Sequence, residues 1–566
     1  MRWIVVAILV LFLAYWIVSA ISPPAVGAWQ DDAIYLATAK SLAEGDGYRL
    51  PHIPVRPYQT KYPIGYPAIL AMMWALYPRY PQNLPLLLAP GAAAAAGFVV
   101  LSAVVVRKVL GASRRMSVAV GVLAAMSPEM LSGVRFTMSD LVFAFFSVAA
   151  VWCLDGKYAS ASAPARRGGW LAAAALLVAA AAMTRTFGVA LWAAAVAMLL
   201  LRRRWTAAGV MVVLVAVCLL PWQLWRSWAV AQNAALATGP LDAYALNYWL
   251  WLPKGVGDAL RVVVCNFFKT VFATGYVQLA LPRSWTGEAI SAVSWRLVAL
   301  HAICWSAAIL VTVGFLARGR RGWKTLHLYA VAYLAMMLLW PFDPSRFLDC
   351  WIPFIFYFLL AGAVGLSRWT LRRRIASASR GRGLVLLPAG AIVVVVAVLF
   401  ITEDHDILLS SRSDYSFMRE GIDLTASDRL YRWITANTAA GDVLASNHTA
   451  ELYLATGRVG HDFGAWSDPV AAYYGRDRQW WRFFTVHSSG EFQWLYDWAC
   501  LDLERTYRQA GVTHYIDDTD HPMAVVMRRF IYTHPQLFQP VFATGPIHPT
   551  YRVYRFTPPE TSTASK

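Results

Sequence analysis

The sequence predicts a polytopic α-helical membrane protein of about 11 transmembrane helices, followed by an extracytoplasmic α/β domain. Of its 566 residues, 58% are hydrophobic and only 14% are charged, and the mean hydropathy is +0.47. Soluble domains are about 45–50% apolar and about 25% charged, so the composition excludes a soluble enzyme. Because the long apolar runs end near residue 401, we divide the chain into a membrane part, 1–401, and a C-terminal domain, 402–566.

Eleven apolar runs approach the length of a membrane span, which needs about 17–25 residues. The first run, at 3–21, is interpreted as an anchor because no convincing signal-peptide cleavage site follows it. The number of helices between 256 and 290 stays open. The other ten runs lie at 84–106, 116–134, 138–155, 169–184, 187–201, 206–223, 290–317, 325–341, 350–367 and 384–401.

Positive charge is concentrated in the membrane part. Residues 1–401 hold 35 basic and 12 acidic residues, whereas residues 402–566 hold 15 and 20. Basic residues flanking membrane spans set orientation, so the net charge of +18 does not indicate a nucleic-acid partner. With 11 spans and a cytoplasmic N-terminus, all five basic clusters face the cytoplasm. These clusters lie at 107–115, 166–167, 202–204, 318–324 and 368–382. The first loop, 22–83, and the C-terminal domain then face outward.

The C-terminal domain has the pattern of a small α/β fold. Helices are predicted at 430–438, 451–456 and 503–510, where Gly457 and Gly511 supply stop signals for the last two. Strands are predicted at 442–445, 512–516 and 550–556, of which the last two alternate in polarity.

The first outer loop carries two adjacent carboxylates, Asp31 and Asp32, at the start of a predicted helix over 31–42. A carboxylate is favourable at a helix N-terminus, so a purely structural cap is one interpretation. The other interpretation is functional, because acidic residues are scarce in the membrane part. Among these few, Asp140 also lies at an outward end of a span, and such groups usually have a partner or a task.

Several cations also lie at outward ends of spans, against the general bias of positive charge toward the cytoplasm. Arginine suits phosphate because its planar group donates two hydrogen bonds at once. The set therefore indicates an anionic ligand at the outer surface, although each member alone also fits a structural ion pair or contact with lipid headgroups. The residues are Arg135, Arg185, Arg226 and Arg346, with Arg56 and Lys61 in the first loop.

The first loop resembles that of the GT-C glycosyltransferases. The nearest group is the dolichyl-phosphate-mannose protein mannosyltransferase-like one, which includes the bacterial aminoarabinose transferases. Asp32 stands where this group usually has Glu, and Ile64 where it often has a second Pro, which leaves the sugar open. The matching residues are Asp31-Asp32, Tyr35, Ala39, Leu42, Gly45, Gly47-Tyr48 and Tyr62-Pro63-x-Gly65-Tyr66-Pro67, followed by Thr137–Asp140, Thr184-Arg185, Pro221-Trp222 with Arg226, and Pro344-x-Arg346-Phe347.

This resemblance implies a transferase that moves a hexosyl or pentosyl group from a polyprenyl-phosphate donor to an extracytoplasmic hydroxyl, with inversion. It implies Asp31 as the general base, with Asp32 as the alternative. Asp140 would orient Lys61 or the acceptor hydroxyl. Arg185, Arg226 and Arg346 would hold the donor phosphate, and the expected substrate-binding set also includes Lys61, Tyr62, Tyr66 and Arg135.

Two other function classes fit the pattern less well. A transporter or flippase of a lipid-linked sugar also needs many spans and a few charges, but transporters tend to place ionisable residues near the midplane and to show internal repeats. A member that has lost catalysis is disfavoured because Asp31, Asp32 and Arg185 are present.

The acceptor, which is a glycan, a lipid or a protein, stays open. The sequence assigns no cofactor, and a divalent metal ion at Asp31, Asp32 and Asp140 is left open, although the acidic motif alone does not require one. The Ala- and Arg-rich composition is typical of a GC-rich bacterial genome. It indicates the plasma membrane as the location, with the lipid bilayer itself as a partner.

Overall fold

The computed structural model describes most of the chain, and every structural statement below refers to these residues. They are 2–21, 26–27, 30–236, 246, 252–253, 255–276, 278–281, 295–340, 344–374, 381–410, 424–462, 503–518, 524–545 and 550–557.

Each of the eleven predicted spans coincides with a helix or a pair of successive helices. Seven are long and apolar enough to cross a membrane, and an eighth is a bent pair. The fold-class prediction is therefore confirmed. The helices are α1 (Arg2–Ile21), α4 (Leu84–Lys108), α5 (Arg114–Ala125) with α6 (Pro128–Arg135), α7 (Asp140–Val151) with η1 (Trp152–Tyr158), α8 (Pro164–Thr184), α9 (Gly188–Leu201), α10 (Trp205–Ala235), α13 (Trp295–Gly319), α14 (Thr325–Leu339), η5 (Arg346–Trp351) with α15 (Ile352–Arg374), and α16 (Gly381–Ser410).

Local chemistry explains where the helices depart from the predicted ranges. The predicted span 116–134 is bent by 48° between α5 and α6. Pro128 is the first residue of α6, where its missing N–H is tolerated, and the preceding Ser127 has an extended backbone. An additional helix, α12 (Val256–Gly275), occupies part of the region whose helix count was open. α16 continues through the predicted domain boundary at 401.

Two further helices, α2 (Asp31–Ala43) and α3 (Gly65–Leu76), lie in the first loop and contact each other. α2 is buried along most of its length. At Gly65, the first residue of α3, a Cβ atom would lie 2.6 Å from the carbonyl oxygen of Met183 at the end of α8, so only glycine allows this close approach. The first loop is thus packed onto the end of the helical part that carries Thr184 and Arg185.

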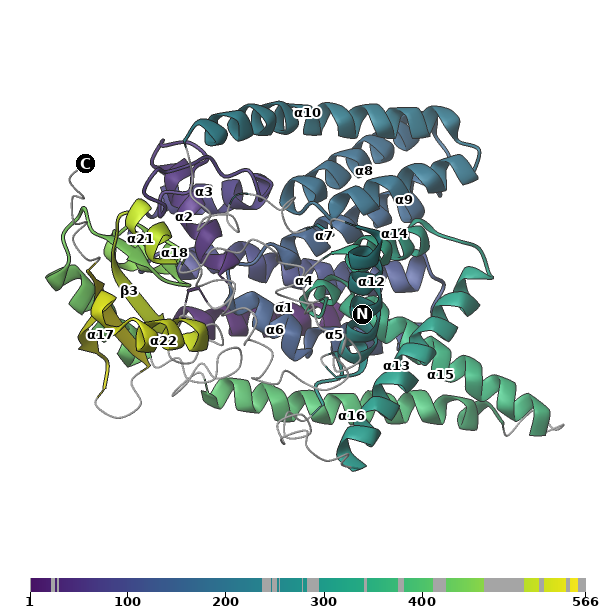
Figure 1. The fold of residues 1–566 in the computed structure, drawn as a ribbon. Coiled ribbons are helices and arrows are strands. Elements are labelled where there is room, and N and C mark those ends of the chain that lie inside the picture. The colour runs from purple at the N-terminus through teal and green to yellow at the C-terminus, as the bar shows by residue number, and fades with distance from the viewer. Residues whose placement is uncertain are drawn as a thin grey trace.

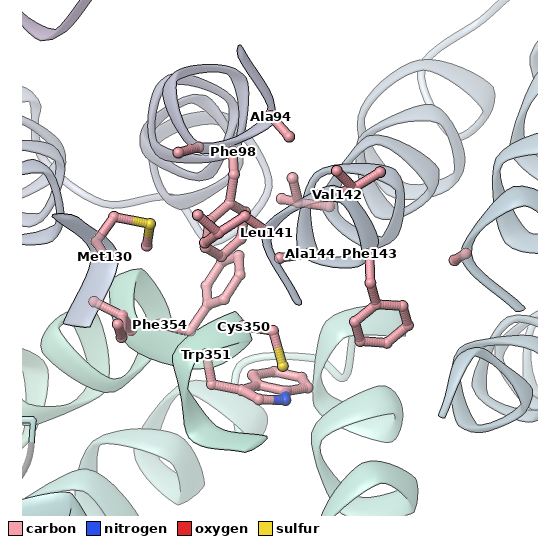
Figure 2. Packing of buried hydrophobic residues seen from close by; sticks show 14 of the residues in the cluster. Ala94, Phe98, Met130, Leu141, Val142, Phe143, Ala144, Cys350, Trp351 and Phe354 are labelled. Atoms are coloured by element: carbon pink, nitrogen blue, oxygen red, sulfur yellow. The ribbon is translucent and has the colours of Figure 1, made fainter. Parts of the chain in front are cut away.

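A dense apolar core includes residues that closely follow Asp140 and Arg346 in the sequence. Figure 2 shows side chains of α4, α6 and α7 packed against those of η5 and α15. Leu141 follows Asp140 in sequence, and Cys350 lies four residues after Arg346. Because packed interiors allow few alternative side-chain positions, this core fixes where Asp140 and Arg346 emerge.

The C-terminal domain holds a five-stranded sheet with the order β2-β1-β3-β5-β4. β1 pairs in parallel with β2 and β3, whereas β5 runs antiparallel to β3 and β4. The two-residue strand β2 and the six-residue strand β4 were not predicted. The elements are α17 (Leu424–Asn437), β1 (Val443–Ala445), α18 (Thr449–Thr456), β2 (Gly460–His461), α21 (Leu503–Gln509), β3 (Val512–Asp518), α22 (Ala524–Thr533), η8 (Pro535–Leu537), β4 (Phe538–Ala543) and β5 (Tyr551–Phe556).

The domain is joined to the first loop. α18 packs on α2, and the two helices lie beside each other in Figure 1. The Gly460 amide N–H donates a hydrogen bond of 2.8 Å to the His52 carbonyl oxygen. This contact brings β2 against a part of the chain some 400 residues earlier.

Candidate functional site

Asp31 is the first residue of α2 and is buried. Its carboxylate accepts a hydrogen bond from the Tyr62 hydroxyl and forms an ion pair of 2.9 Å with Nη2 of Arg346. Burial alone raises the pKa of Asp31, but the charges of Arg346 and Lys61 and the Tyr62 hydrogen bond lower it below its usual value. Asp31 is therefore an ionised carboxylate in a buried setting.

Lys61 lies beside this carboxylate. Its side chain is buried, and Nζ lies 4.9 Å from the centre of the Tyr62 ring. Burial lowers the pKa of Lys61 to about 7, while the charges of Asp31 and Asp462 act in the opposite direction. The charge of Lys61 therefore changes near neutral pH.

Asp140, the first residue of α7, forms an ion pair with Arg185 just after α8. The guanidinium groups of Arg185 and Arg346 lie 5.1 Å and 5.7 Å from the Phe347 ring. Arg346 interacts electrostatically with both Asp31 and Asp140, so the two ion pairs form one group. We call Asp31, Lys61, Tyr62, Asp140, Arg185 and Arg346 the Asp31–Asp140 cluster.

Asp32 faces a different environment from its neighbour. Its Oδ2 accepts a hydrogen bond of 2.9 Å from the Gly27 amide, and its side chain is almost fully buried. Its backbone carbonyl lies 3.4 Å from the hydroxyl of Thr137, which comes just before α7. Asp32 therefore stabilises the turn that leads into α2, whereas Asp31 forms an ion pair with Arg346.

The structure also shows the surroundings of the remaining predicted residues. Tyr66 is fully buried, and its ring packs edge-on against Tyr35 at 5.2 Å. Arg226 donates from Nε to the Thr60 carbonyl at 2.9 Å, next to Lys61 in sequence. Arg135 is buried at the end of α6.

The structure shows the carboxylate partners of these side chains. Asp140, which was expected to orient Lys61 or an acceptor hydroxyl, pairs with Arg185. Arg185 and Arg346, which were expected to hold a phosphate, pair with Asp140 and Asp31. Among the residues that the structure describes, no group of three or more His, Cys, Asp and Glu side chains is placed to hold a metal ion. Asp31, Asp32 and Asp140 therefore do not form such a group in this structure.

Sequence reasoning missed a small pocket near the cluster, which has room for about one water molecule. It lies between α2, the 52–53 segment and the start of α18. Gln30 takes part in it, and its Nε2 lies 3.4 Å from both the Asn447 carbonyl and Oδ1 of Asp462. The lining residues are Gly27, Gln30, Ala33, Ile34, His52, Ile53, Asn447, His448, Thr449, Ala450, Glu451 and Asp462.

Only Gln30 had a sequence signal, its place directly before the Asp31-Asp32 pair. Its φ of 59° is uncommon for a residue other than glycine, and strained backbone often lies at functional sites. The other polar lining residues are His52 and a group within 447–462, and only the fold shows that these two parts of the chain share a pocket with Gln30.

Comparison with known proteins gives a structural match only. No protein-family model matches the sequence, and no curated protein matches it. The archaeal oligosaccharyltransferase AglB from Archaeoglobus fulgidus, solved with an inhibitory peptide and a dolichol-phosphate, superposes with a TM-score of 0.52 at 12% identity, over 97% of this chain and 74% of that one.

Two other solved structures are similar over most of this chain. AglB tethered to an acceptor peptide gives 0.53 at 13% identity, over 97% of this chain and 74% of that one. ArnT from Cupriavidus metallidurans bound to undecaprenyl phosphate gives 0.47 at 15% identity, over 97% of both chains. The likeness to AglB shows the fold, which is that of the GT-C glycosyltransferases and confirms the resemblance seen in the first loop.

Proposed function

We propose that this protein is an integral-membrane glycosyltransferase that moves a sugar from a polyprenyl-phosphate donor to an acceptor hydroxyl, with inversion at the anomeric carbon. The observation that carries the proposal is the ionised Asp31 carboxylate, buried among Arg346, Lys61 and Tyr62 in a chain with the GT-C fold. A buried carboxylate next to several cations suits a reaction that moves a proton at one atom and frees a phosphate at another.

Asp31 is the general base in this proposal. Its carboxylate takes the proton from the acceptor hydroxyl while that oxygen forms a bond to the anomeric carbon. The bond from the anomeric carbon to the phosphate oxygen breaks, and the phosphate keeps the electron pair and leaves as polyprenyl phosphate. The proton on Asp31 then passes to water. Arg346 and Tyr62 orient the carboxylate. We choose Asp31 over Asp32 because Asp31 meets the Arg346 cation, whereas Oδ2 of Asp32 binds the backbone amide of Gly27.

Arg185 and Arg346 hold the phosphate in this proposal. Each guanidinium has five N–H donors, so each can keep its carboxylate partner and still donate to a phosphate oxygen. Lys61 adds a positive charge when it is protonated. Arg226 supports the loop through the Thr60 carbonyl, which keeps Lys61 in place. These groups stabilise the negative charge that develops as the phosphate leaves.

The position in the membrane follows from charge and hydropathy. We propose a multi-pass protein of the bacterial plasma membrane with a cytoplasmic N-terminus and an extracytoplasmic C-terminal domain, 402–566. The Asp31–Asp140 cluster then meets the lipid-linked donor at the outer surface. The dolichol-phosphate in the AglB structure is a lipid phosphate of the same chemical class as the polyprenyl phosphate that the proposed reaction releases.

The runner-up is a transporter or flippase of a lipid-linked sugar. Transporters tend to hold ionisable residues at the bilayer midplane. On the helix formed by α7 and η1, the acidic residues are Asp140 at the first residue and Asp155 in the last turns. This arrangement at helix ends favours the transferase.

A transfer assay tests the proposal. The purified full-length protein, reconstituted in lipid bilayers, is incubated with a panel of radiolabelled polyprenyl-phosphate sugars and a crude envelope extract. We expect label to move from one lipid donor to an acceptor, and Asp31→Asn to prevent this. No transfer from any donor, together with protein-dependent movement of the labelled lipid across the bilayer, would replace the transferase with the flippase.

A further inference from the structure

Several contacts hold the C-terminal domain against the first loop. α18 packs on α2, and the Lys40 ammonium of α2 lies 4.7 Å from the centre of the Tyr453 ring of α18. The Gly460 amide of β2 donates to the His52 carbonyl oxygen. Because these contacts involve both a helix and the backbone of a strand, the domain has a defined position relative to α2.

Gln30, the residue before Asp31, is bound by two groups of the C-terminal domain. Its side-chain nitrogen, Nε2, donates hydrogen bonds of 3.4 Å to the Asn447 carbonyl oxygen and to Oδ1 of Asp462. A carboxamide has two N–H donors, so the one nitrogen can serve both acceptors. Gln30 thereby joins the C-terminal domain to the residue that precedes the proposed base.

The backbone of Gln30 also sets where α2 begins. Its carbonyl oxygen accepts a hydrogen bond of 3.2 Å from the Ile34 amide, and its own amide donates to the Gly27 carbonyl oxygen at 3.0 Å. Its φ of 59° is a conformation that persists in a residue other than glycine only when its surroundings hold it there. The side-chain contacts that keep Gln30 in this conformation therefore also keep the neighbouring Asp31 in place.

Asp462 has a second connection to the cluster, through its charge. Three charged groups act on the Lys61 ammonium. Asp31 and Asp462 favour its protonated form, and Arg346 disfavours it. Burial lowers the pKa of Lys61 to about 7, and the two carboxylates keep this pKa from falling further. Asp462 is itself buried, so salt screens its charge little. The charge of Lys61 near neutral pH therefore depends on a carboxylate of the C-terminal domain.

We propose that Asp462 is a positioning residue for sugar transfer, which keeps Asp31 in place through Gln30 and keeps Lys61 charged. In this role Asp462 acts through its two neighbours and takes no part in the bond changes. The inference rests on the proposed transferase function, which assigns Asp31 as the base and Lys61 as a cation beside the donor phosphate. It makes the C-terminal domain a part of the active site.

The first experiment isolates the charge of Asp462. Asp462→Asn keeps an oxygen that accepts from Gln30 but removes the charge, so the pKa of Lys61 should fall below about 7. The Kd of undecaprenyl phosphate is titrated with the whole chain in lipid nanodiscs from pH 5 to pH 9, and the lipid phosphate titrates equally in every variant. We expect the rise of Kd with pH to move down by roughly one pH unit. At pH 9, where Lys61 is neutral in both proteins, the Kd should not be raised.

Three controls separate this effect from a loss of structure. Asp462→Glu restores the charge and should return the pH profile toward that of the wild type. Asp517→Asn removes another buried carboxylate of the domain, on β3 beside Arg528, and should leave the profile unchanged. In a Lys61→Arg background, Asp462→Asn should have no effect on the profile, because the group through which it acts no longer titrates.

The second experiment isolates the contact made by Gln30. Gln30→Gly adopts a φ of 59° without strain but lacks the amide. We expect the transfer rate at saturating donor to fall roughly 10–100-fold, since a small misplacement of a catalytic group costs up to about 100-fold. Amide hydrogen exchange over residues 31–36 should become faster, while the pH profile of the Kd stays that of the wild type. Gln30→Asn, which keeps a shorter amide and tolerates positive φ, should recover part of the rate.

The inference is overturned if Asp462→Asn binds undecaprenyl phosphate like the wild type at every pH, if Asp517→Asn shows the same shift, or if Gln30→Gly keeps the wild-type rate and exchange. If Asp462→Asn fails to fold, Asp462→Ser replaces it. A wild type that transfers no sugar would contradict the proposed function. The expected shifts in Kd and in hydrogen exchange would still support the coupling of Asp462 to Lys61 and α2, because neither measurement needs transfer.

Discussion

The two ends of one helix carry buried carboxylates with different surroundings. Asp155, near the end of η1, accepts a hydrogen bond of 2.7 Å from the Thr325 amide and pairs with Arg202 at 2.9 Å. Asp140, at the start of α7, pairs with Arg185, and its Oδ2 has no hydrogen-bond partner among the described residues. The Asp155 side chain is 0% exposed and that of Asp140 is 11% exposed.

This difference separates a structural ion pair from a candidate site. At Asp155, a backbone amide and one arginine join η1 to the ends of α9 and α14. At Asp140, two carboxylates pair with two arginines in one group, and each arginine has further N–H donors that can bind an anion. Buried ion pairs are weak evidence for stability, so retention of several at one place is better explained by binding or catalysis.

The largest effect is expected for Asp31→Asn, which keeps the shape but removes the base. Transfer should fall at least 100-fold, since general-base catalysis contributes about 10²–10⁴-fold. The measurement is the initial rate with purified protein at saturating donor, and Asp155→Asn at the opposite end is the matched control. Equal rates in Asp31→Asn and wild type would move the base to another residue.

Replacing the arginines of the cluster should weaken donor binding next. Arg346→Lys and Arg185→Lys keep the charge but lose the two-pronged donor geometry. Loss of one charge-assisted hydrogen bond, about 1.5–3 kcal/mol, predicts a rise in the undecaprenyl-phosphate Kd of roughly 10–150-fold. Titration of the protein in nanodiscs measures this. Arg202→Lys should leave the Kd unchanged, and a similar rise there would mean that the cluster has no special role.

Asp155→Ala should change stability and leave the chemistry intact. It removes the acceptor for the Thr325 amide and the partner of Arg202, so we expect a loss of about 1–3 kcal/mol, seen as a lower Tm in detergent. Transfer per folded molecule should remain near the wild-type value. A strong loss of specific activity without a lower Tm would mean that both ends of the helix take part in function.

The smallest expected effect is a pH dependence from Lys61. The pKa of Lys61 is about 7, so its ammonium is present below that pH and lost above it. Asp31 stays ionised throughout because its pKa lies below the usual 3.8. The donor KM should therefore rise a few-fold from pH 6 to pH 9. Lys61→Arg, which stays charged, should flatten this profile. An unchanged slope in that variant would assign the titration to another group.

Hydropathy alone located the helices because the requirement to bury about 17–25 apolar residues in a bilayer acts on each span separately. The residues of the first loop likewise identified the GT-C resemblance, since Asp31-Asp32 and Tyr62–Pro67 are local patterns. The two-residue strand β2 escaped prediction because its pairing partner, β1, lies outside its own sequence window.

The resemblance ranked Asp31 above Asp32, but only the tertiary structure shows how their surroundings differ. The two residues are adjacent and chemically identical, and their different environments come from Arg346, which lies more than 300 residues away, and from the Gly27 amide. The same holds for the pocket that joins His52 to Asp462. The sequence by itself determined the membrane class and the position of the acidic motif, because hydropathy and motif spacing are local properties. The tertiary structure decided which carboxylate meets the cations and which side chains share a pocket, because these depend on contacts between distant parts of the chain.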